Sequence, residues 1–354
     1  MKKRVTIVGG GINGLVAANY LSKSGFSVSL IEKKSRLGGA CTYQTKTINS
    51  KKIDYAQGAT VLGMMPDFIF KELGLSKSLK IFAPKHPKLV YFPESSVSTK
   101  IYQNHKRLHD ELKLKWNEKG DLRQFRNDES KVIDFIRKGY RNAESPSYEK
   151  AENELGKNLA KIWIKGSAKK LLDHYFTSDK TKIYMGMTCI ESGASSIHNE
   201  GTAFTIPLMD SGSVFNGYWG YVKGGIWKIT DEISNINKQL GVDQFCSSEI
   251  ITVDNNKSKI VFEKNNRIQE LSYDYLIFAT DPLTPAKLLK NNKILKEFEK
   301  KDFLGTSGKI TAFFKKPVVW KEKSGYKNSD TAFRFIFSNN TLDDFENSSQ
   351  KSAK

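Results

Sequence analysis

The sequence predicts an α/β protein that begins with a parallel sheet and carries a second, α+β domain inserted into the first. A short apolar run, Val5–Val8, passes directly into glycines and then into a helical pattern, as a buried strand followed by a helix does. Another apolar run, Phe26–Ile31, follows the predicted end of that helix at Gly25. At 354 residues the chain is longer than one ordinary core needs, so we expect about two domains.

The composition is that of a globular protein with an unusually basic surface. Hydrophobic residues make up 38% of the chain and aromatic residues 11%, which is enough for a sizeable core. The formal net charge is +19, and such a charge attracts nucleic acids, anionic membranes or anionic substrates. The basic residues are scattered, and no RNA-binding motif or zinc-finger spacing accompanies them. We therefore expect a Lys-rich surface with no specific nucleic-acid partner, and a peripheral membrane contact is the alternative.

Cysteine and histidine usage indicates no metal site. The three cysteines lie far apart and form no CxxC motif, which predicts neither a disulfide framework nor a zinc site. His105 and His109 stand four residues apart, but without an HExxH motif a solvated helix face is the better interpretation. No stretch approaches 18 apolar residues, and the apolar run after Met1–Arg4 is too short for a signal peptide. We expect a cytoplasmic protein.

The first turn has the GxGxxG pattern, with glycines at positions 9, 11 and 14. Gly9 permits a tight strand-to-helix turn, Gly11 lets the backbone approach a pyrophosphate, and Gly14 lets the helix pack close to the strand. The free N–H groups where the helix begins, at Ile12 and Asn13, face the phosphates of such a ligand. The pattern therefore predicts a phosphate-binding turn.

Glu32 ends the second strand, at the spacing expected for an acid that binds ribose. Its carboxylate can accept hydrogen bonds from both ribose hydroxyls, so strand, glycines, helix, strand and acid together predict a unit that binds the ADP part of a dinucleotide. Lys33 and Lys34 could instead hold the 2′-phosphate of NADP, but Glu32 would repel that phosphate.

The segment after Glu32 carries a resemblance to a known family. Arg36 follows four residues later, and the pair Gly38–Gly39 comes next. This order resembles the extended ADP-binding signature of amine oxidase and phytoene desaturase flavoproteins. The chain as a whole resembles the phytoene desaturase-like flavoproteins, nearest to the branch named pyridine nucleotide-disulfide oxidoreductase domain-containing protein 2. The segments that carry the resemblance are Gly9–Gly14, Glu32–Gly39, Glu72–Leu75, Gly201–Ala203, Trp219–Gly225 and Ala279–Pro282.

The resemblance implies FAD as the cofactor, bound by a Rossmann-like FAD/NAD(P)-binding domain with an inserted mixed-sheet and helical substrate domain. It implies an enzyme that moves a hydride from a C–C or C–N bond of a small, apolar substrate to flavin N5. Lys223 is the candidate catalytic residue, a charged group near the flavin, and Trp219 and Tyr221 are candidates for the substrate path. The candidate cofactor-binding residues are Gly9, Gly11, Ile12, Asn13, Gly14, Glu32, Lys33, Arg36, Gly38, Gly39, Ala40, Gly58, Ala59, Gly224, Gly225, Ile250, Ala279 and Thr280.

Domain boundaries and two alternatives complete the expectations. We expect the FAD-binding domain at 1–75 and 216–290, a largely helical substrate region at 76–215, incomplete substrate-domain strands at 291–338, and a disordered tail at 339–354. Family members are longer, and their C-terminal part returns a glycine-rich segment to the flavin. We find none here, so we expect a C-terminal half or a partner chain to complete the FAD site. An amine oxidase and a non-catalytic FAD-binding scaffold are the alternatives.

Overall fold

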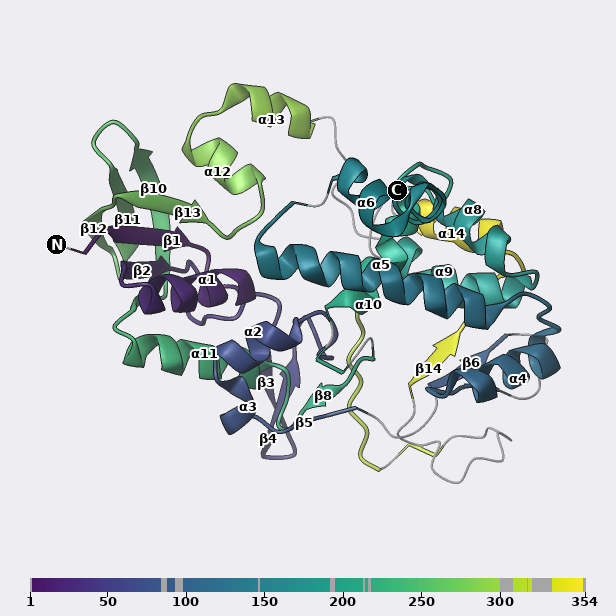
Figure 1. Cartoon of the computed structure of the whole chain (residues 1–354). Helices are drawn as coiled ribbons and strands as arrows, with labels where there is room; N and C mark the ends of the chain where they lie inside the picture. The colour runs from purple at the N-terminus through teal and green to yellow at the C-terminus, as the bar shows by residue number, and fades with distance from the viewer. Residues whose placement is uncertain are drawn as a thin grey trace. The chain divides into compact units, whose positions relative to one another are not determined.

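The structure is a computed structural model that divides into two compact units (Figure 1). Unit 1 comprises residues 1–82 and 219–302, and unit 2 comprises residues 83–218 and 303–354. These units change at 82, 218 and 302, where the sequence suggested 75, 215 and 290. The structure describes residues 2–83, 88–92, 98–145, 147–191, 195–212, 214–215, 218–299, 308–316, 318–319 and 333–352.

A four-stranded parallel sheet forms the centre of unit 1. Its strands are β1 (Arg4–Val8), β2 (Ser27–Ile31), β9 (Asp243–Phe245) and β13 (Tyr275–Phe278), in the order β13-β1-β2-β9. Every neighbouring pair is parallel, and α1 (Ile12–Lys23) connects β1 to β2. The predicted α/β class, with a parallel strand–helix–strand unit at the N-terminus, is confirmed.

The two N-terminal strands form where the sequence is rich in apolar and β-branched residues. Ile7 and Leu30 are fully buried, and Val8 and Ile31 are nearly so, as expected for parallel strands covered on both faces. The helix between them ends because Gly25 adopts a positive φ of 89°, a conformation that cannot continue an α-helix.

Helix α11 (Trp227–Gln239) packs against α1 within unit 1. A pair of fully buried amides joins the two helices. The side-chain nitrogen of Asn19 donates to the side-chain oxygen of Asn237 at 2.9 Å, and the nitrogen of Asn237 donates to the carbonyl of Leu15 at 2.9 Å. Because buried amides need hydrogen bonds, this pair fixes the register of α11 on α1.

Two antiparallel assemblies are inserted in the chain between strands of the central sheet. The strands β10 (Ser248–Asp254), β11 (Lys259–Lys264) and β12 (Arg267–Ser272) form a three-stranded antiparallel sheet. Its residues Ile260 and Phe262 share an apolar cluster with Val8 and Ile31. The hairpin β3 (Tyr43–Ile48) and β4 (Lys51–Ala56) forms the second assembly.

The remaining elements of unit 1 are short. Strand β5 (Ile81–Phe82) pairs antiparallel with β8 (Tyr221–Val222). Two short helices, α2 (Asp67–Glu72) and α3 (Leu75–Ser78), are separate because Gly74 between them is left-handed. The unit ends with α12 (Leu283–Leu288) and α13 (Asn292–Glu299). The prediction of strands from residue 291 is therefore wrong for α13, whose apolar residues repeat at helical spacing.

Unit 2 is mostly helical, as expected for the region 76–215. Its helices are α4 (His105–Trp116), α5 (Leu122–Asn142), α6 (Tyr148–Leu155), α7 (Lys157–Leu159), the π-helical η1 (Ala160–Lys165), α8 (Ala168–Tyr175), α9 (Asp179–Glu191), the 3₁₀-helical η2 (Thr202–Phe204), α10 (Thr205–Ser211) and α14 (Leu342–Ser352). A small sheet of β6 (Lys88–Tyr91), β7 (Thr99–Ile101) and β14 (Arg334–Ile336) has the order β14-β6-β7. The core includes the fully buried rings of Phe125 and Trp163, whose centroids are 5.1 Å apart.

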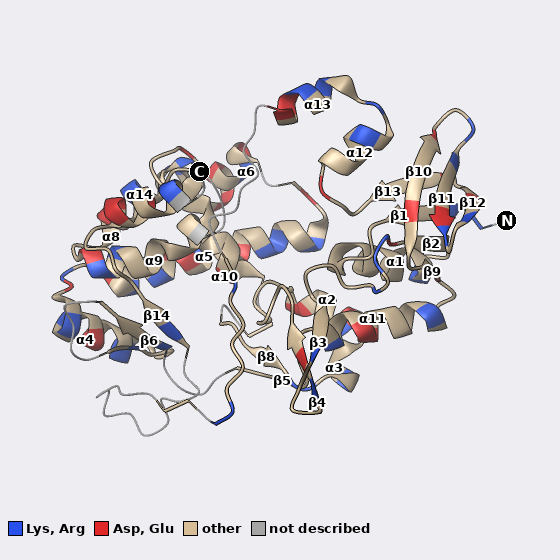
Figure 2. Cartoon of the chain, turned by 180° about the vertical axis from the view of Figure 1, so that it is seen from behind, with Lys and Arg blue, Asp and Glu red and all other residues tan. Residues whose placement is uncertain are grey.

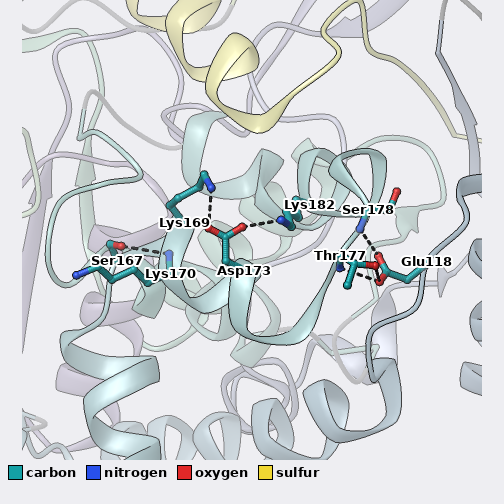
Figure 3. Close-up of polar contacts among 8 residues, drawn as sticks. All are labelled: Glu118, Ser167, Lys169, Lys170, Asp173, Thr177, Ser178 and Lys182. Carbon is teal, nitrogen blue, oxygen red and sulfur yellow. Dashed lines mark hydrogen bonds and ion pairs between the residues drawn. The ribbon is translucent and has the colours of Figure 1, made fainter.

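Two polar clusters hold α8 and α9 in place (Figure 3). The buried carboxylate of Glu118 accepts hydrogen bonds from the backbone N–H groups of Gly120, Thr177 and Ser178. These last two residues directly precede α9. On α8, the carboxylate of Asp173 accepts from both Lys169 and Lys182 at 2.6 Å (Figure 3). One cluster is buried and the other lies at the surface, so their energetic weights differ.

The C-terminal tail differs from the prediction. Residues 342–352 form α14, so the expectation of a disordered segment at 339–354 is wrong for this part. Leu342 is 1% exposed, and the ring of Phe345 meets that of Phe337 edge-on, with the centroids 5.5 Å apart. The carboxylate of Glu346 accepts the backbone N–H of Ile197 at 2.8 Å. The helix forms because these residues, spaced three and one apart, lie on one face and anchor it to unit 2.

Charges are distributed over both units. Figure 2 shows Lys and Arg interleaved with Asp and Glu on elements throughout the chain rather than gathered on one of them. Within the described residues, no helix is long and apolar enough to cross a bilayer, and no three His, Cys, Asp or Glu side chains gather as metal ligands. Cys41, Cys189 and Cys246 carry free thiols.

Candidate dinucleotide site

The turn between β1 and α1 is built around glycines that no other residue could replace without strain. Gly9 has a φ of +106°, and a Cβ on it would lie 2.6 Å from the carbonyl oxygen of Ala279. A Cβ on Gly14 would lie 2.0 Å from the carbonyl oxygen of Gly9. Both contacts are far closer than van der Waals distance, so these two glycines are required by the fold of the turn itself.

Gly11 is different, because the protein leaves the space beside it open. Its φ of −70° and ψ of 179° suit any residue. The nearest atom to a Cβ built there is the Cα of Gly39, at 3.9 Å. Gly11 is also the N-cap of α1, and no side chain caps that helix. The backbone N–H groups at Ile12 and Asn13 therefore begin a helix whose positive end faces an open position, which suits an anionic group.

Glu32 lies beside this turn at the end of β2. It is 9% exposed. One carboxylate oxygen accepts the N–H of Gly10 at 2.7 Å and the other accepts the N–H of Lys34 at 2.9 Å. A carboxylate has about four lone-pair sites, so these two bonds fix its orientation and leave capacity for ribose hydroxyls. Lys33, between them, is exposed.

The segment after Glu32 returns to the same turn. The N–H of Gly38 donates to the carbonyl of Gly10 at 2.7 Å, and Gly38 forms a parallel bridge with Gly11. Gly39 has a φ of +58° and approaches Gly11 so closely that a Cβ on it would lie 3.0 Å from the Cα of Gly11. The hydroxyl of Thr42 donates to the carbonyl of Gly39 at 3.1 Å. The paired glycines predicted from sequence thus lie next to the phosphate turn.

Two further predicted pairs are brought to this region. The N–H of Ala59 donates to the carbonyl of Ala40 at 2.9 Å, and a Cβ on Gly58 would lie 2.6 Å from that carbonyl oxygen. The pair at 279–280 lies at the turn as well. The N–H of Ala279 donates to the carbonyl of Val8 at 2.8 Å, and the methyl of Thr280 would be 2.9 Å from a Cβ on Gly9.

The predicted residues of the run at 219–225 lie on a separate strand arrangement in unit 1. Gly220 and Leu62 exchange both backbone hydrogen bonds, and a Cβ on Gly63 would lie 2.7 Å from the ring of Trp219. The ring of Tyr221 lies 5.7 Å from that of Phe82. These contacts place the two candidate substrate-path residues beside the 62–63 and 81–82 segments.

Lys223, Gly224 and Gly225 follow directly. Lys223 is exposed, and its N–H donates to the carbonyl of Lys80 at 2.8 Å. Both glycines have positive φ values, 87° and 111°, so they form the turn into α11. None of the described contacts joins Lys223 to the glycine turn. Ile250, the remaining candidate, is partly buried and packs on the apolar cluster that contains Val8 and Ile31.

Sequence reasoning missed the residues that tie α11 to this site. The hydroxyl of Thr230 donates to the carbonyl of Cys41 at 3.1 Å and lies 2.8 Å from the position of a Cβ on Gly38. Tyr43 and Trp227 contact each other, with ring centroids 5.0 Å apart. The density of aromatic residues after 217 was the available signal, but it did not indicate the partner.

The thiols of unit 1 are poor nucleophiles. Burial raises the pKa of Cys41, and burial together with the Glu32 carboxylate raises the pKa of Cys246. Because the thiolate is the reactive form, both thiols remain protonated near neutral pH. The site therefore offers a glycine cradle and a carboxylate, without a redox cysteine.

Comparison with known proteins gives the same result for the fold and adds relatives. The family model of the NAD(P)-binding Rossmann-like domain matches residues 7–64. The phytoene desaturase of Fusarium fujikuroi is 24% identical over 272 residues, which cover 72% of this chain and 44% of the desaturase. The flavin-containing amine oxidase B of Bos taurus is 39% identical over 75 residues, 20% of this chain and 14% of the oxidase. The chain is thus similar to phytoene desaturases over most of its length and to a flavin-containing amine oxidase over 75 residues.

Two further relatives show how much of a similar protein this chain covers. The 4,4'-diaponeurosporene oxygenase of Staphylococcus haemolyticus (strain JCSC1435) is 23% identical over 313 residues, which cover 84% of this chain and 60% of the oxygenase. A triple mutant of putrescine oxidase has the same fold, with a TM-score of 0.52 at 19% identity over 81% of this chain and 60% of the oxidase. The chain thus spans about half the length of the relatives it matches.

Proposed function

We propose that unit 1 binds FAD and that the protein is an FAD-dependent oxidoreductase of the phytoene desaturase type. The observation that carries this proposal is Gly11. Its backbone conformation and its protein surroundings would accept a side chain, so the glycine has no packing explanation and the open space beside it suits a pyrophosphate. The matches to a phytoene desaturase and a diaponeurosporene oxygenase, over 72% and 84% of the chain, support the type.

The residues of the cradle fit the parts of FAD in order. The N-terminus of α1 holds the phosphates with backbone N–H groups, because its first turn has no side-chain cap. Glu32, fixed by Gly10 and Lys34, accepts from the ribose hydroxyls. The Gly38–Gly39 backbone, held against Gly10 and Gly11, lies along the phosphates from the other side. Bound FAD supplies the hydride acceptor, and the chain supplies position and charge.

The proposed substrate is a small apolar molecule whose C–C single bond becomes a double bond: one carbon loses a hydride to the flavin and its neighbour loses a proton. Relatives named for carotenoid precursors match across the inserted unit as well as the dinucleotide unit, and Trp219 and Tyr221 supply apolar rings in unit 1. An amine, oxidised at a C–N bond, is the second candidate because of the 39% identity to amine oxidase B. That match covers 75 residues, so it supports the cofactor more than the substrate.

The proposal extends to surroundings and partners. Three free cysteines fit the reducing conditions of the cytoplasm. In this proposal Lys223 supplies a positive charge near the flavin. In this proposal the net charge of +19 is a general property of a Lys-rich surface. The one specific interaction that it would favour is a peripheral contact with an anionic membrane.

The deciding experiment is an absorption spectrum of the purified chain after incubation with FAD and desalting. We expect flavin bands to remain with the wild-type chain and to be absent with Gly11→Ala, because the added methyl occupies the space of the pyrophosphate. Both proteins should have the same melting temperature without FAD. Loss of flavin from the wild-type chain, or equal retention by Gly11→Ala, would contradict the proposed cofactor site.

Substrate class is tested on the same flavin-loaded protein under anaerobic conditions. Phytoene in detergent micelles should bleach the flavin bands, whereas putrescine should leave them unchanged. Bleaching by putrescine alone would replace the first candidate with the amine oxidase. If the chain without flavin binds NADP⁺ and added FAD does not displace it, the choice of cofactor is wrong.

A further inference from the structure

We propose that Tyr43 and Trp227 are positioning residues of the dinucleotide site. The Tyr43 ring, backed by the Trp227 ring, holds the guanidinium of Arg36 and, through Arg36, keeps the Gly38–Gly39 segment against the turn between β1 and α1. This inference rests on the proposed binding of FAD in unit 1 and assigns a role to two residues outside the set of predicted cofactor-binding residues.

The three side chains form a continuous stack. The guanidinium carbon of Arg36 lies 3.8 Å from the centroid of the Tyr43 ring, and the Tyr43 and Trp227 rings are 5.0 Å apart at an angle of 44°. A cation over the face of an aromatic ring at this distance is attracted by the ring quadrupole. Arg36 is exposed and forms no ion pair within the described residues, so the ring is its main fixed contact.

Each member of the stack comes from a different part of unit 1. Arg36 lies in the loop after β2, Tyr43 is the first residue of β3, and Trp227 is the first residue of α11. Trp227 packs against the backbone of Gly225: a Cβ built on Gly225 would lie 2.2 Å from the Trp227 ring. Only a glycine in the positive-φ conformation leaves that space, so the turn at 224–225 places the ring.

The stack reaches the cradle through two residues of backbone. Gly38, two positions after Arg36, donates its N–H to Gly10 and bridges to Gly11. Gly38 and Gly39 both have positive φ, 123° and 58°, and glycines lose much conformational freedom on ordering. A segment of this kind needs an external anchor to stay in its bound shape. Arg36 on one side and Thr230, bonded to the carbonyl of Cys41, on the other provide it.

The test measures FAD affinity by fluorescence titration for the wild-type chain, Tyr43→Leu and Tyr43→Phe. Loss of the ring should weaken binding about 2–5-fold, the effect of one exposed cation–π contact, whereas Tyr43→Phe should bind as the wild type does. Tyr140→Leu, a change of an exposed tyrosine on α5 in unit 2, is the matched control and should have no effect. Trp227→Leu should act as Tyr43→Leu does.

A double-mutant cycle separates positioning from a direct charge contact. If the stack positions the loop, Arg36→Met and Tyr43→Leu weaken binding equally, the double variant is no weaker than either, and the salt dependence of binding stays that of the wild type. A flattened salt dependence in Arg36→Met, with full affinity in Tyr43→Leu, would overturn the inference, because Arg36 would then meet the phosphates without needing the ring.

A second readout does not depend on FAD. Hydrogen exchange of the peptide containing the Gly38 amide should be faster in Tyr43→Leu than in Tyr43→Phe, since this amide is bonded to Gly10. If the wild-type chain binds no FAD but exchange is still faster in Tyr43→Leu, the proposed function is wrong and the positioning role remains. Unchanged exchange and unchanged affinity in Tyr43→Leu would refute the positioning role itself.

Discussion

Gly11 and Gly14 stand three residues apart in one turn, yet the structure requires them for different reasons. A Cβ on Gly14 would lie 2.0 Å from the carbonyl of Gly9, whereas a Cβ on Gly11 meets nothing closer than 3.9 Å. We expect Gly14→Ala to lower the free energy of unfolding by about 1–3 kcal/mol or more, the cost of overpacking. Gly11→Ala should leave it unchanged. Urea denaturation without FAD measures both, and equal destabilisation by the two variants would contradict the structure.

At the scale of single residues, the sequence predicted what local spacing encodes. The glycines of the first turn and Glu32 follow a fixed order along the chain, so their spacing alone placed them. Tyr43 and Trp227 meet across more than half the chain's length, and no local pattern links them. Gly225 was expected from the sequence to bind the cofactor, whereas its second role, room for the Trp227 ring, exists only in the folded chain.

The loop before α9 depends on one buried carboxylate, which gives a prediction at the scale of an element. Burial pushes the pKa of Glu118 up, but hydrogen bonds from Thr177, Gly120 and Ser178 outweigh it and hold the pKa below the ordinary value of 4.5. We expect Glu118→Gln to lower the free energy of unfolding at pH 7 by about 1–3 kcal/mol, because buried N–H groups lose their charged acceptor. Urea denaturation gives this value.

The pH dependence of Glu118 has a definite sign. A carboxyl group whose pKa is lower in the folded chain contributes stability above its unfolded value, and the contribution disappears as the pH falls through the folded value. The gap between wild type and Glu118→Gln should therefore be constant from pH 7 to about pH 5 and close below 4.5. A gap that widens in acid would contradict this assignment.

Asp173 is the matched control for Glu118. Its carboxylate accepts hydrogen bonds from Lys169 and Lys182, but the side chain is 39% exposed. Surface ion pairs contribute about 1 kcal/mol or less. Asp173→Asn should thus change the free energy of unfolding far less than Glu118→Gln does.

Among elements, length and burial decided which ones were predictable. The N-terminal strand–helix–strand unit was predicted because its apolar residues recur over enough positions to indicate each element. Strand β9 has three residues and was missed, since its place in the sheet comes from pairing with β2. Helix α14 was taken for a tail because its sequence is polar. Two or three anchoring side chains, Leu342 among them, were enough to order it.

The whole molecule consists of two units, and a ligand of one should act on that unit. FAD that binds unit 1 stabilises it by about 2.7 kcal/mol when present at about 100 times the dissociation constant. In calorimetry we expect the transition of unit 1 to shift to higher temperature with FAD while that of unit 2 stays in place. Hydrogen exchange of β1 and α5 assigns the transitions. A shift of both together would show that the chain unfolds as one cooperative body.

The order of strands in the central sheet also sets a timetable for synthesis. Strands β1 and β2 leave the ribosome first, but β9 starts at Asp243 and β13 at Tyr275. At about 5–20 residues per second, the wait from β2 to β9 is about 10–40 s. During that time the helices from α4 to α10 of unit 2 emerge and close their local contacts, while the apolar edges of β1 and β2 lack their outer neighbours. A nascent chain stalled in this interval exposes the dinucleotide sheet as a half-built edge, which makes this the stage most dependent on chaperones.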